Sequence, residues 1–445
     1  MPTTAEATLA EYLAAFNDAD PQAIEAFARD RTTLRQASAS WPVQRRSAGP
    51  LTLISSEAAG DHAVSAVLQD RWDRYFRLKL TVAEGAPPRI SAMGAEPLEP
   101  PNDAPPARMD WPQLREALAA KLVNNVAQGW FSGALVVSRN GETLFQAVHG
   151  LADREAAVPN TLETRFRMGS MNKMLTGVSA LQLVAAGAMR LDDPVGRHLP
   201  DYPSHAFAET VTVGHLLNHT GGAGDFFGPA FSEHRLQLAD IKDYVALLGA
   251  RDPEFEPGSQ FRYANYGFIV LGAVIEAASG SAYDDYVAAN ILGPAGMTAT
   301  GALPESVEVP GRAIGYMEGR DGLVRSDPTL PVRGTPAGGG YSTVGDLVRF
   351  AEALTSGRLL EAESLVLVIE GGIEAGPGAT YGMGFGKGAY DGSRWCGHHG
   401  GAPGQNGALT IFPDTGYVIA ALSNGDPPQA SSLSNFIQAR VPLAG

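Results

Sequence analysis

The first hundred residues carry two hydrophobic periodicities, one helical and one typical of strands. Apolar residues at the i, i+3, i+4, i+7 spacing of a helix face are Leu9, Tyr12, Leu13 and Phe16. Ile24 and Phe27 predict a second helix after Asp20-Pro21. Alternating polar and apolar residues then predict antiparallel strands with one wet face, at residues 51–55, 64–68, 76–82 and 90–93.

A proline-rich segment follows this pattern. Residues 101–112 include Pro101, Pro105 and Pro106 among acidic and small residues, which is typical of a stiff, extended linker. Helices followed by a sheet resemble the NTF2-like cone fold. We therefore expect residues 1–100 to form a small α+β accessory domain for packing or recognition, and residues 113–445 to form a second domain.

Beyond the linker, strand patterns lie at both ends of a long helical segment. Residues 114–126 have helical spacing, and Asn140-Gly141 predicts the tight turn of a hairpin over residues 134–145. Strand patterns return at residues 407–412 and 417–422, before a helix near 434–440. This order predicts an α+β fold in which one antiparallel sheet is built from distant parts of the chain, with a helical insertion.

Composition narrows the partners and the location. The chain has 445 residues, a net charge of −15 and a single cysteine, Cys396. The negative charge argues against a nucleic-acid or anionic-membrane partner, and one cysteine excludes an internal disulfide and a cysteine-based zinc cluster. No stretch reaches the roughly 18 consecutive apolar residues of a membrane span, and no secretory signal begins the chain. We expect a cytoplasmic protein with a small-molecule substrate; the sequence leaves its oligomeric state open.

Ser170 and Lys173 stand three residues apart where an apolar helical stripe begins. That spacing puts both side chains on one helix face, with Ser170 at the end where free N–H groups and the positive end of the dipole point. A hydroxyl there can lose its proton to a neighbouring amine and attack a carbonyl. No other lysine in the chain has a serine three residues before it. A capping serine followed by a solvated lysine is the alternative, so the case depends on the rest of the chain.

Two further stretches place reactive residue types beside turns or strands. Tyr263 and Asn265 follow the turn Pro257-Gly258 and precede an apolar helix, where side chains can project into a cleft. His398 and His399 precede paired glycines, which let a strand backbone approach a ligand closely. Taken alone, each stretch is as readily explained by packing or by a hydrogen bond in the core.

Other candidate sites are weaker. His215 and His219 have the i, i+4 spacing of a helical zinc site but lack an intervening glutamate and a third ligand, so we predict no metal. Residues 382–388 are glycine-rich but match no phosphate-binding loop, and the chain has no Gly-x-Ser-x-Gly elbow. Cys396 is expected to be a small buried thiol. We predict that the protein needs no cofactor.

Taken in order, Ser170-Met-Asn-Lys173, Tyr263-Ala-Asn265 and His398-His399-Gly400 resemble the three motifs of the serine β-lactamase and penicillin-binding-protein superfamily. The resemblance is strongest to its class C-like branch, which holds family VIII esterases and D-aminopeptidases, and it covers about residues 110–440. It implies a β-lactamase-like antiparallel sheet flanked by helices, and a serine hydrolase that works through an acyl-enzyme.

The resemblance also implies individual roles. Ser170 would be the nucleophile and Lys173 the neighbour that accepts or shuttles its proton. Tyr263 would be the base in acylation and the acid for the leaving group. Asn265 would bind the acyl-side carbonyl or amide of the substrate. The N–H groups of Ser170 and Gly401 would form the oxyanion hole.

Two departures from the superfamily pattern bear on the substrate. His398 stands where β-lactamases usually have lysine, and a neutral imidazole would bind a substrate carboxylate weakly. Asn172 stands where many relatives have threonine. We therefore expect a carboxylesterase acting on small esters, with amidase, D-aminopeptidase or β-lactamase activity as alternatives at the same site. A non-catalytic protein that binds an acyl ligand is the alternative from another class.

Overall fold

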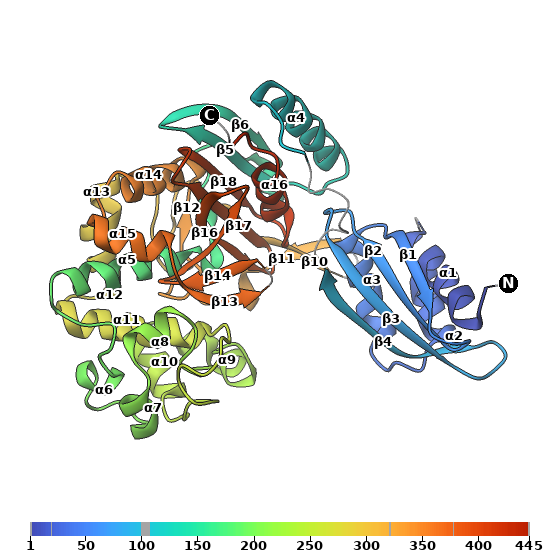
Figure 1. Cartoon of the computed structure of the whole chain (residues 1–445), viewed down its shortest axis with the longest axis horizontal. Helices are drawn as coiled ribbons and strands as arrows, with labels where there is room; N and C mark the ends of the chain where they lie inside the picture. The colour runs from blue at the N-terminus through green and yellow to red at the C-terminus, as the bar shows by residue number, and fades with distance from the viewer. Residues whose placement is uncertain (1, 19, 99–106, 320–321, 377, 444–445) are drawn as a thin grey trace. The chain divides into compact units, whose positions relative to one another are not determined.

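The computed structural model describes residues 2–18, 20–98, 107–319, 322–376 and 378–443 (Figure 1). The chain forms two compact units. The first comprises Met1–Ala107 with Glu318–Val324, and the second comprises Arg108–Met317 with Arg325–Gly445. The prolines on which the predicted linker depends, Pro101, Pro105 and Pro106, lie outside the described residues.

Among its described residues, the first unit has three helices and a four-stranded antiparallel sheet in the order β1-β2-β3-β4. The helices are α1 (Thr4–Asn17), α2 (Pro21–Arg31) and α3 (Ala37–Ala48). The strands are β1 (Thr52–Ala58), β2 (Ala63–Gln69), β3 (Tyr75–Ala83) and β4 (Arg89–Leu98). The predicted helices and strands are confirmed, whereas the likeness to the NTF2-like cone stays a prediction.

Helix α3 was not predicted, although it completes the core of this unit. Its Trp41 ring lies 5.1 Å from that of Tyr12, which in turn lies 5.6 Å from that of Phe16. The helix contains Pro42, a residue that normally ends a helical pattern, and few apolar side chains. Its helical state therefore depends on packing against α1 and α2 rather than on local periodicity.

The second unit is built on an eight-stranded sheet in the order β13-β14-β15-β16-β17-β18-β5-β6. Its strands are β5 (Gly133–Arg139), β6 (Glu142–His149), β13 (Ile373–Gly376), β14 (Ala379–Gly382), β15 (Phe385–Tyr390), β16 (Ser393–Ala402), β17 (Gln405–Phe412) and β18 (Tyr417–Ser423). All neighbouring pairs are antiparallel, and β18 pairs with β5 at Ala420↔Val136. The predicted α+β fold, with one sheet made from distant parts of the chain, is confirmed.

Successive residues of the central strands point into two cores. Leu135 and Val137 pack with Leu118 of α4 (Trp111–Ala127) and Leu433 of α16 (Gln429–Gln438). Val136, between them, packs on the other side, with the core that contains α5 and α14. Helices therefore cover both faces of the sheet (Figure 1), which explains why its central strands are buried throughout.

The remaining elements form the insertion of the second unit, its borders and the part of the first unit that lies within residues 318–324. The helices are α5 (Asn172–Ala185), α6 (Val195–His198), α7 (His205–Thr210), α8 (Val213–Leu217), α9 (Pro229–His234), α10 (Ile241–Leu248), α11 (Asn265–Ser279), α12 (Tyr283–Val287), α13 (Gly293–Ala295), α14 (Val344–Thr355) and α15 (Ala362–Ile369). Short strands are β7 (Leu151–Asp153), β8 (Val158–Pro159), β9 (Phe166–Arg167), β10 (Tyr316–Gly319), β11 (Gly322–Arg325) and β12 (Tyr341–Ser342). Among the described residues, no single helix is long and apolar enough to cross a bilayer, and one pair bent by 75°, Asn265–Ser279 with Tyr283–Ala295, meets that test by length and composition alone.

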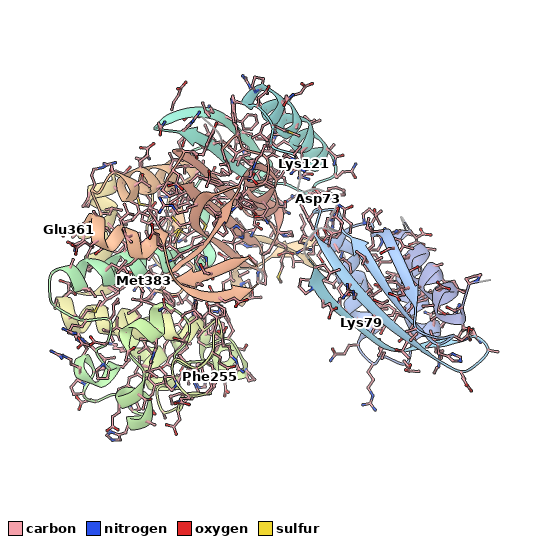
Figure 2. All side chains as sticks on the ribbon, in the orientation of Figure 1. Asp73, Lys79, Lys121, Phe255, Glu361 and Met383 are labelled. Carbon is pink, nitrogen blue, oxygen red and sulfur yellow. The ribbon has the colours of Figure 1, made fainter. Side chains whose placement is uncertain are left out.

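Helix α5 lies against the turn between β14 and β15 without room for a side chain. A Cβ atom on Gly177 would lie 2.0 Å from the carbonyl oxygen of Met383, which is labelled in Figure 2. A Cβ atom on Gly384 would lie 2.3 Å from the carbonyl oxygen of Lys173. The two glycines thus allow the helix that carries Lys173 to touch the sheet backbone.

We expect Gly177→Ala to lower the free energy of unfolding by at least about 2 kcal/mol, because a fixed backbone carbonyl occupies the space of the added methyl group. Gly345→Ala is the matched control, since that helical glycine has no neighbouring atom closer than 3.8 Å to the added carbon. The control should be neutral or up to about 1 kcal/mol more stable, because alanine favours helix. Urea denaturation measures both, and equal stabilities would contradict the packing argument.

Candidate active site

Ser170 lies in a tight 3-10 turn, Gly169–Met171, immediately before α5. The backbone of strand β16 lies directly against the backbone of this turn. A Cβ atom on Gly400 would lie 2.0 Å from the carbonyl oxygen of Met168 and 3.2 Å from the amide nitrogen of Ser170. A Cβ atom on Gly169 would lie 2.9 Å from the amide nitrogen of Gly401. The glycines thereby bring the amides of Ser170 and Gly401 to the same small region, as an oxyanion hole requires.

Lys173, the second residue of α5, is fully buried, at 0 % exposure. Its Nζ donates to the side-chain oxygen of Asn265 at 2.7 Å and to the carbonyl oxygen of Ala337 at 2.6 Å. Burial lowers the pKa of Lys173 to about 7, while the charge of Asp225 acts in the opposite direction. A large fraction of this amine is therefore neutral near pH 7.

Tyr263 brings its hydroxyl to Ser170. The Ser170 side chain lies close enough to this hydroxyl to influence its pKa, and Lys173 Nζ lies 4.8 Å from the centre of the Tyr263 ring. Although 38 % of the residue is exposed, its hydroxyl lies deep enough that burial raises the pKa of Tyr263, whereas the neighbouring Ser170 side chain lowers it. The phenol is therefore protonated and able to donate a proton at neutral pH.

Asn265, the first residue of α11, joins Lys173 to an acid that the sequence analysis missed. Its Oδ1 accepts from Lys173, and its Nδ2 donates to Asp225 Oδ2 at 2.8 Å. The carboxylate of Asp225 thus fixes which way the amide of Asn265 points. One N–H of that amide remains for a substrate carbonyl.

His398 is neutral and occupied on both ring nitrogens. Its Nδ1–H faces the carbonyl oxygen of His399, so its Nε2 accepts a hydrogen bond from the hydroxyl of Tyr381 at 3.1 Å. Burial, with a smaller contribution from Lys173, lowers the pKa of His398 to about 3. An unperturbed histidine has a pKa near 6.5. The tertiary environment makes the imidazole neutral throughout the physiological range.

Two other residues singled out from the sequence have structural roles. The buried Asn172 accepts a hydrogen bond from the N–H of Gly340 at 2.9 Å and so holds the loop that follows Ala337. Cys396 is buried in β16, and burial raises its pKa to about 12, as expected for an unreactive thiol. Within the described ranges, no group of three or more His, Cys, Asp or Glu side chains could hold a metal ion.

Sequence reasoning missed Asp225 and Tyr381, and it assigned His219 no role in the reaction. Asp225 follows a glycine-rich loop and Tyr381 lies in a short strand, so no local pattern marks either as functional. His219 lies beyond the end of α8 with a φ of +58°, and its ring centre is 4.2 Å from that of Tyr263. The only available signal for a functional role was that polar residues in or beside loops often take part in binding or catalysis.

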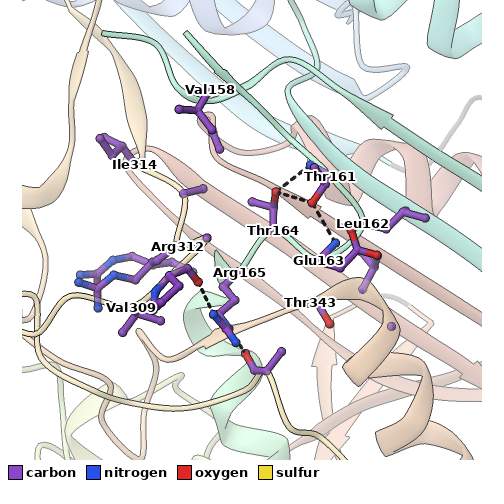
Figure 3. A pocket seen from close by; sticks show the side chains of 18 of the residues that line it. Val158, Thr161, Leu162, Glu163, Thr164, Arg165, Val309, Arg312, Ile314 and Thr343 are labelled. Atoms are coloured by element: carbon purple, nitrogen blue, oxygen red, sulfur yellow. Dashed lines mark hydrogen bonds between the residues drawn. The ribbon is translucent and has the colours of Figure 1, made fainter. Parts of the chain in front are cut away.

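A separate cavity of about 1420 Å³ lies outside this site, lined mainly by residues 152–167, 298–315 and 343–352 (Figure 3). Its arginines hold the surrounding loops. Arg165 donates to the carbonyl oxygen of Ala299 at 3.2 Å, and Arg312 donates to that of Val307 at 3.0 Å. None of Ser170, Lys173 and Tyr263 lines this cavity, so its size is not evidence about the reaction.

Comparisons with known proteins agree with this geometry. A family model described as Beta-lactamase matches residues 97–441. The chain is 32% identical over 334 residues to penicillin-binding protein 4 of Amycolatopsis lactamdurans, covering 70% of this chain and 85% of that protein. It is 33% identical over 287 residues to esterase EstB of Burkholderia gladioli, covering 57% and 73%.

Solved structures give the same picture. A penicillin-binding protein from Bacillus halodurans superposes with a TM-score of 0.66 and 28% identity, over 71% of this chain and 99% of that chain. A D-amino acid amidase from Ochrobactrum anthropi SV3 superposes with a TM-score of 0.62 and 27% identity, over 74% and 97%. The similarity thus extends over a large part of the chain and includes proteins of differing activity.

The pKa of Lys173 generates a prediction about pH. If neutral Lys173 takes the proton of Ser170, the rate at which an uncharged fluorophosphonate labels Ser170 should rise through about pH 7 and then level off. Asp225→Asn removes a charge that stabilises the ammonium form, so the midpoint should move to lower pH. Glu116→Gln, an exposed acid on α4, is the control and should leave the midpoint unchanged. A profile without a midpoint between pH 5 and 9 would exclude Lys173 as the acceptor.

Proposed function

Because the chain belongs to the beta-lactamase family, we propose that it is a serine hydrolase that cleaves small carboxylic esters through an acyl-enzyme on Ser170. One observation carries this proposal: Lys173 is buried with two fixed hydrogen-bond acceptors, Asn265 and Ala337. A neutral amine has two N–H groups and one lone pair. The two acceptors therefore match the neutral form and leave the lone pair for a proton.

In the proposed acylation step, the proton of Ser170 passes to the lone pair of Lys173, directly or through the hydroxyl of Tyr263. The Ser170 oxygen attacks the ester carbonyl carbon, and the resulting oxyanion accepts hydrogen bonds from the amides of Ser170 and Gly401. The tetrahedral intermediate collapses and the C–O bond to the alcohol breaks. Tyr263 donates the proton that the leaving alkoxide needs, and Lys173 restores it.

Deacylation repeats these transfers with water. A water molecule gives its proton to the same amine–phenol pair and attacks the acyl carbon, and the bond to Ser170 then breaks with return of the proton to the serine oxygen. The raised pKa of Tyr263 suits a proton donor, so we assign the first acceptor role to Lys173. Asn265 contributes its free amide N–H to the acyl-side carbonyl or amide of the substrate.

The environment of His398 supports uncharged substrates. A carboxylate beside β16 would meet a neutral imidazole whose two nitrogens are already bonded, with no cation or free donor from that side chain. Esters without a carboxylate do not need such a partner. This feature favours small esters over β-lactams and D-alanyl peptides, whose recognition depends on a carboxylate.

An amidase acting on amino-acid derivatives is the second candidate, and Asp225 is the observation that favours it. Its carboxylate is exposed and bonds the amide of Asn265, which would face the acyl part of a substrate. A substrate ammonium group on that part could pair with Asp225. A D-amino acid amidase is among the similar structures.

Substitutions at the three reactive groups test the proposed mechanism. Ser170→Ala should abolish turnover without changing the melting temperature by more than a few degrees, because only the reacting oxygen is removed. Lys173→Ala and Tyr263→Phe should each lower kcat by about 10²–10⁴, the range for loss of a general acid or base. Mass spectrometry should find fluorophosphonate on Ser170 of the wild-type protein. Full turnover in Ser170→Ala would refute the assignment.

Rates on a panel of substrates test the proposed preference for small esters over β-lactams. At pH 7.5, kcat/KM for p-nitrophenyl butyrate should exceed that for nitrocefin or benzylpenicillin by at least about 10²-fold. The ratio should stay the same at pH 6, because the pKa of His398, about 3, leaves the imidazole neutral at both values. The Ser170→Ala protein provides the blank for spontaneous hydrolysis. Comparable efficiency on a β-lactam would overturn the ester preference, and a higher value for D-phenylalanine amide would replace it with the amidase.

A further inference from the structure

His219 holds the backbone on both sides of Tyr263. The N–H of Arg262 donates to the carbonyl oxygen of His219 at 2.9 Å, and the N–H of Ala264 donates to its Nδ1 at 3.1 Å. The imidazole also lies against the side chain between them, with its centre 4.2 Å from that of the Tyr263 ring. One residue therefore fixes both the peptide groups that flank Tyr263 and the position of its ring.

His219 has an unfavourable backbone conformation and, within the described part of the chain, an unpaired ring nitrogen. His219 has a φ of +58°, in the left-handed region that few residues other than glycine adopt. Because Nδ1 accepts a hydrogen bond, the ring proton lies on Nε2. That Nε2 is buried and has no hydrogen-bond partner among the described residues. Both features cost free energy, so the geometry is not explained by local stability.

The surroundings require His219 to be neutral. The residue is 1 % exposed, and its ring lies 5.0 Å from that of Phe268 and 4.6 Å from that of Tyr381. Burial, followed by the charge of Lys173, lowers its pKa well below the ordinary value. A proton on Nδ1 would also break the hydrogen bond from Ala264.

We propose that His219 is a positioning residue that holds the hydroxyl of Tyr263 at Ser170 by clamping the segment from Arg262 to Ala264. The inference rests on the proposed function, in which the Tyr263 hydroxyl carries protons between Ser170, Lys173 and the leaving group. His219 contributes an acceptor and a flat surface, and it acts on the reaction only through Tyr263. Displacement of a reacting group by even about 1 Å can cost about 10²-fold in rate.

Two substitutions separate this role from simple packing. His219→Phe keeps a ring against Tyr263 but leaves the N–H of Ala264 without its acceptor. His219→Asn loses the ring but places an oxygen where Nδ1 lies, and asparagine tolerates left-handed backbone. His215→Asn is the matched control, because the Nδ1 of His215 also accepts a backbone N–H, from Thr212 at 3.3 Å, on α8.

We expect His219→Phe to lower kcat for p-nitrophenyl butyrate at least about 10-fold while KM changes less than about 3-fold, because positioning of the proton carrier is lost and substrate binding is not. For His219→Asn, the decrease in log kcat relative to the wild type should be at most about two thirds of the decrease for His219→Phe. His215→Asn should match the wild type. Melting temperatures report the stability of each variant separately.

A double-mutant cycle gives the decisive readout. In a Tyr263→Phe background, adding His219→Phe should lower kcat by less than about 3-fold, because the hydroxyl on which His219 acts is already gone. The proposal would be overturned if the two substitutions lowered kcat by independent factors that multiply in the double variant. It would also be overturned if His219→Phe kept the wild-type kcat, or if the kcat of His219→Asn were no higher than that of His219→Phe. If His219→Phe fails to fold, the same cycle is run with His219→Asn.

If neither variant folds, hydrogen exchange in the wild-type protein decides. The amide of Ala264 should exchange at least about 10²-fold more slowly than exposed loop amides, and rapid exchange would overturn the clamp. A wild-type protein that neither turns over the ester nor accepts fluorophosphonate on Ser170 would instead refute the proposed function. The two failures are therefore distinguishable.

Discussion

The site depends on the removal of one lysine from water. Lys173 has no exposed surface, and the cost of burying its charge brings its pKa to about 7. Its two hydrogen-bond acceptors come from different parts of the chain, the start of α11 and the loop at Ala337. Both elements must be in place for the amine to be neutral and correctly oriented. The start of α11 and the loop at Ala337 thus both contact this one nitrogen.

Close backbone approach is the second constraint, and glycine makes it possible. Gly400 lets β16 pass the Ser170 turn, and Gly177 lets α5 lie against the β14–β15 turn. A methyl group at either position would come within 2.0 Å of a carbonyl oxygen. Because Ser170, Lys173 and Gly401 lie on elements that meet at these contacts, the glycines set the distances among the three residues.

The architecture of the chain was largely readable from its sequence. Asn140 and Gly141 marked a hairpin whose residues adopt φ values of +50° and +84°, and the strand patterns at both ends paired as β18 with β5. Local signals sufficed there because turn geometry and alternation are properties of neighbouring residues. They failed for α3, whose Pro42 contradicts a helix, and for the start of α16, which lies several residues before the predicted 434.

The sequence by itself determined the three motifs and their order along the chain: Ser170 with Lys173, then Tyr263 with Asn265, then His398 ahead of paired glycines. Spacing along the chain carries that information. The tertiary structure decided their chemical states, because burial and hydrogen bonding depend on residues far away in sequence. Burial makes His398 neutral and Tyr381 bonds its Nε2, Asp225 orients Asn265, and His219 accepts the N–H of Ala264 beside Tyr263. None of these partners lies within fifteen residues of the group it controls, so no local pattern could have assigned it.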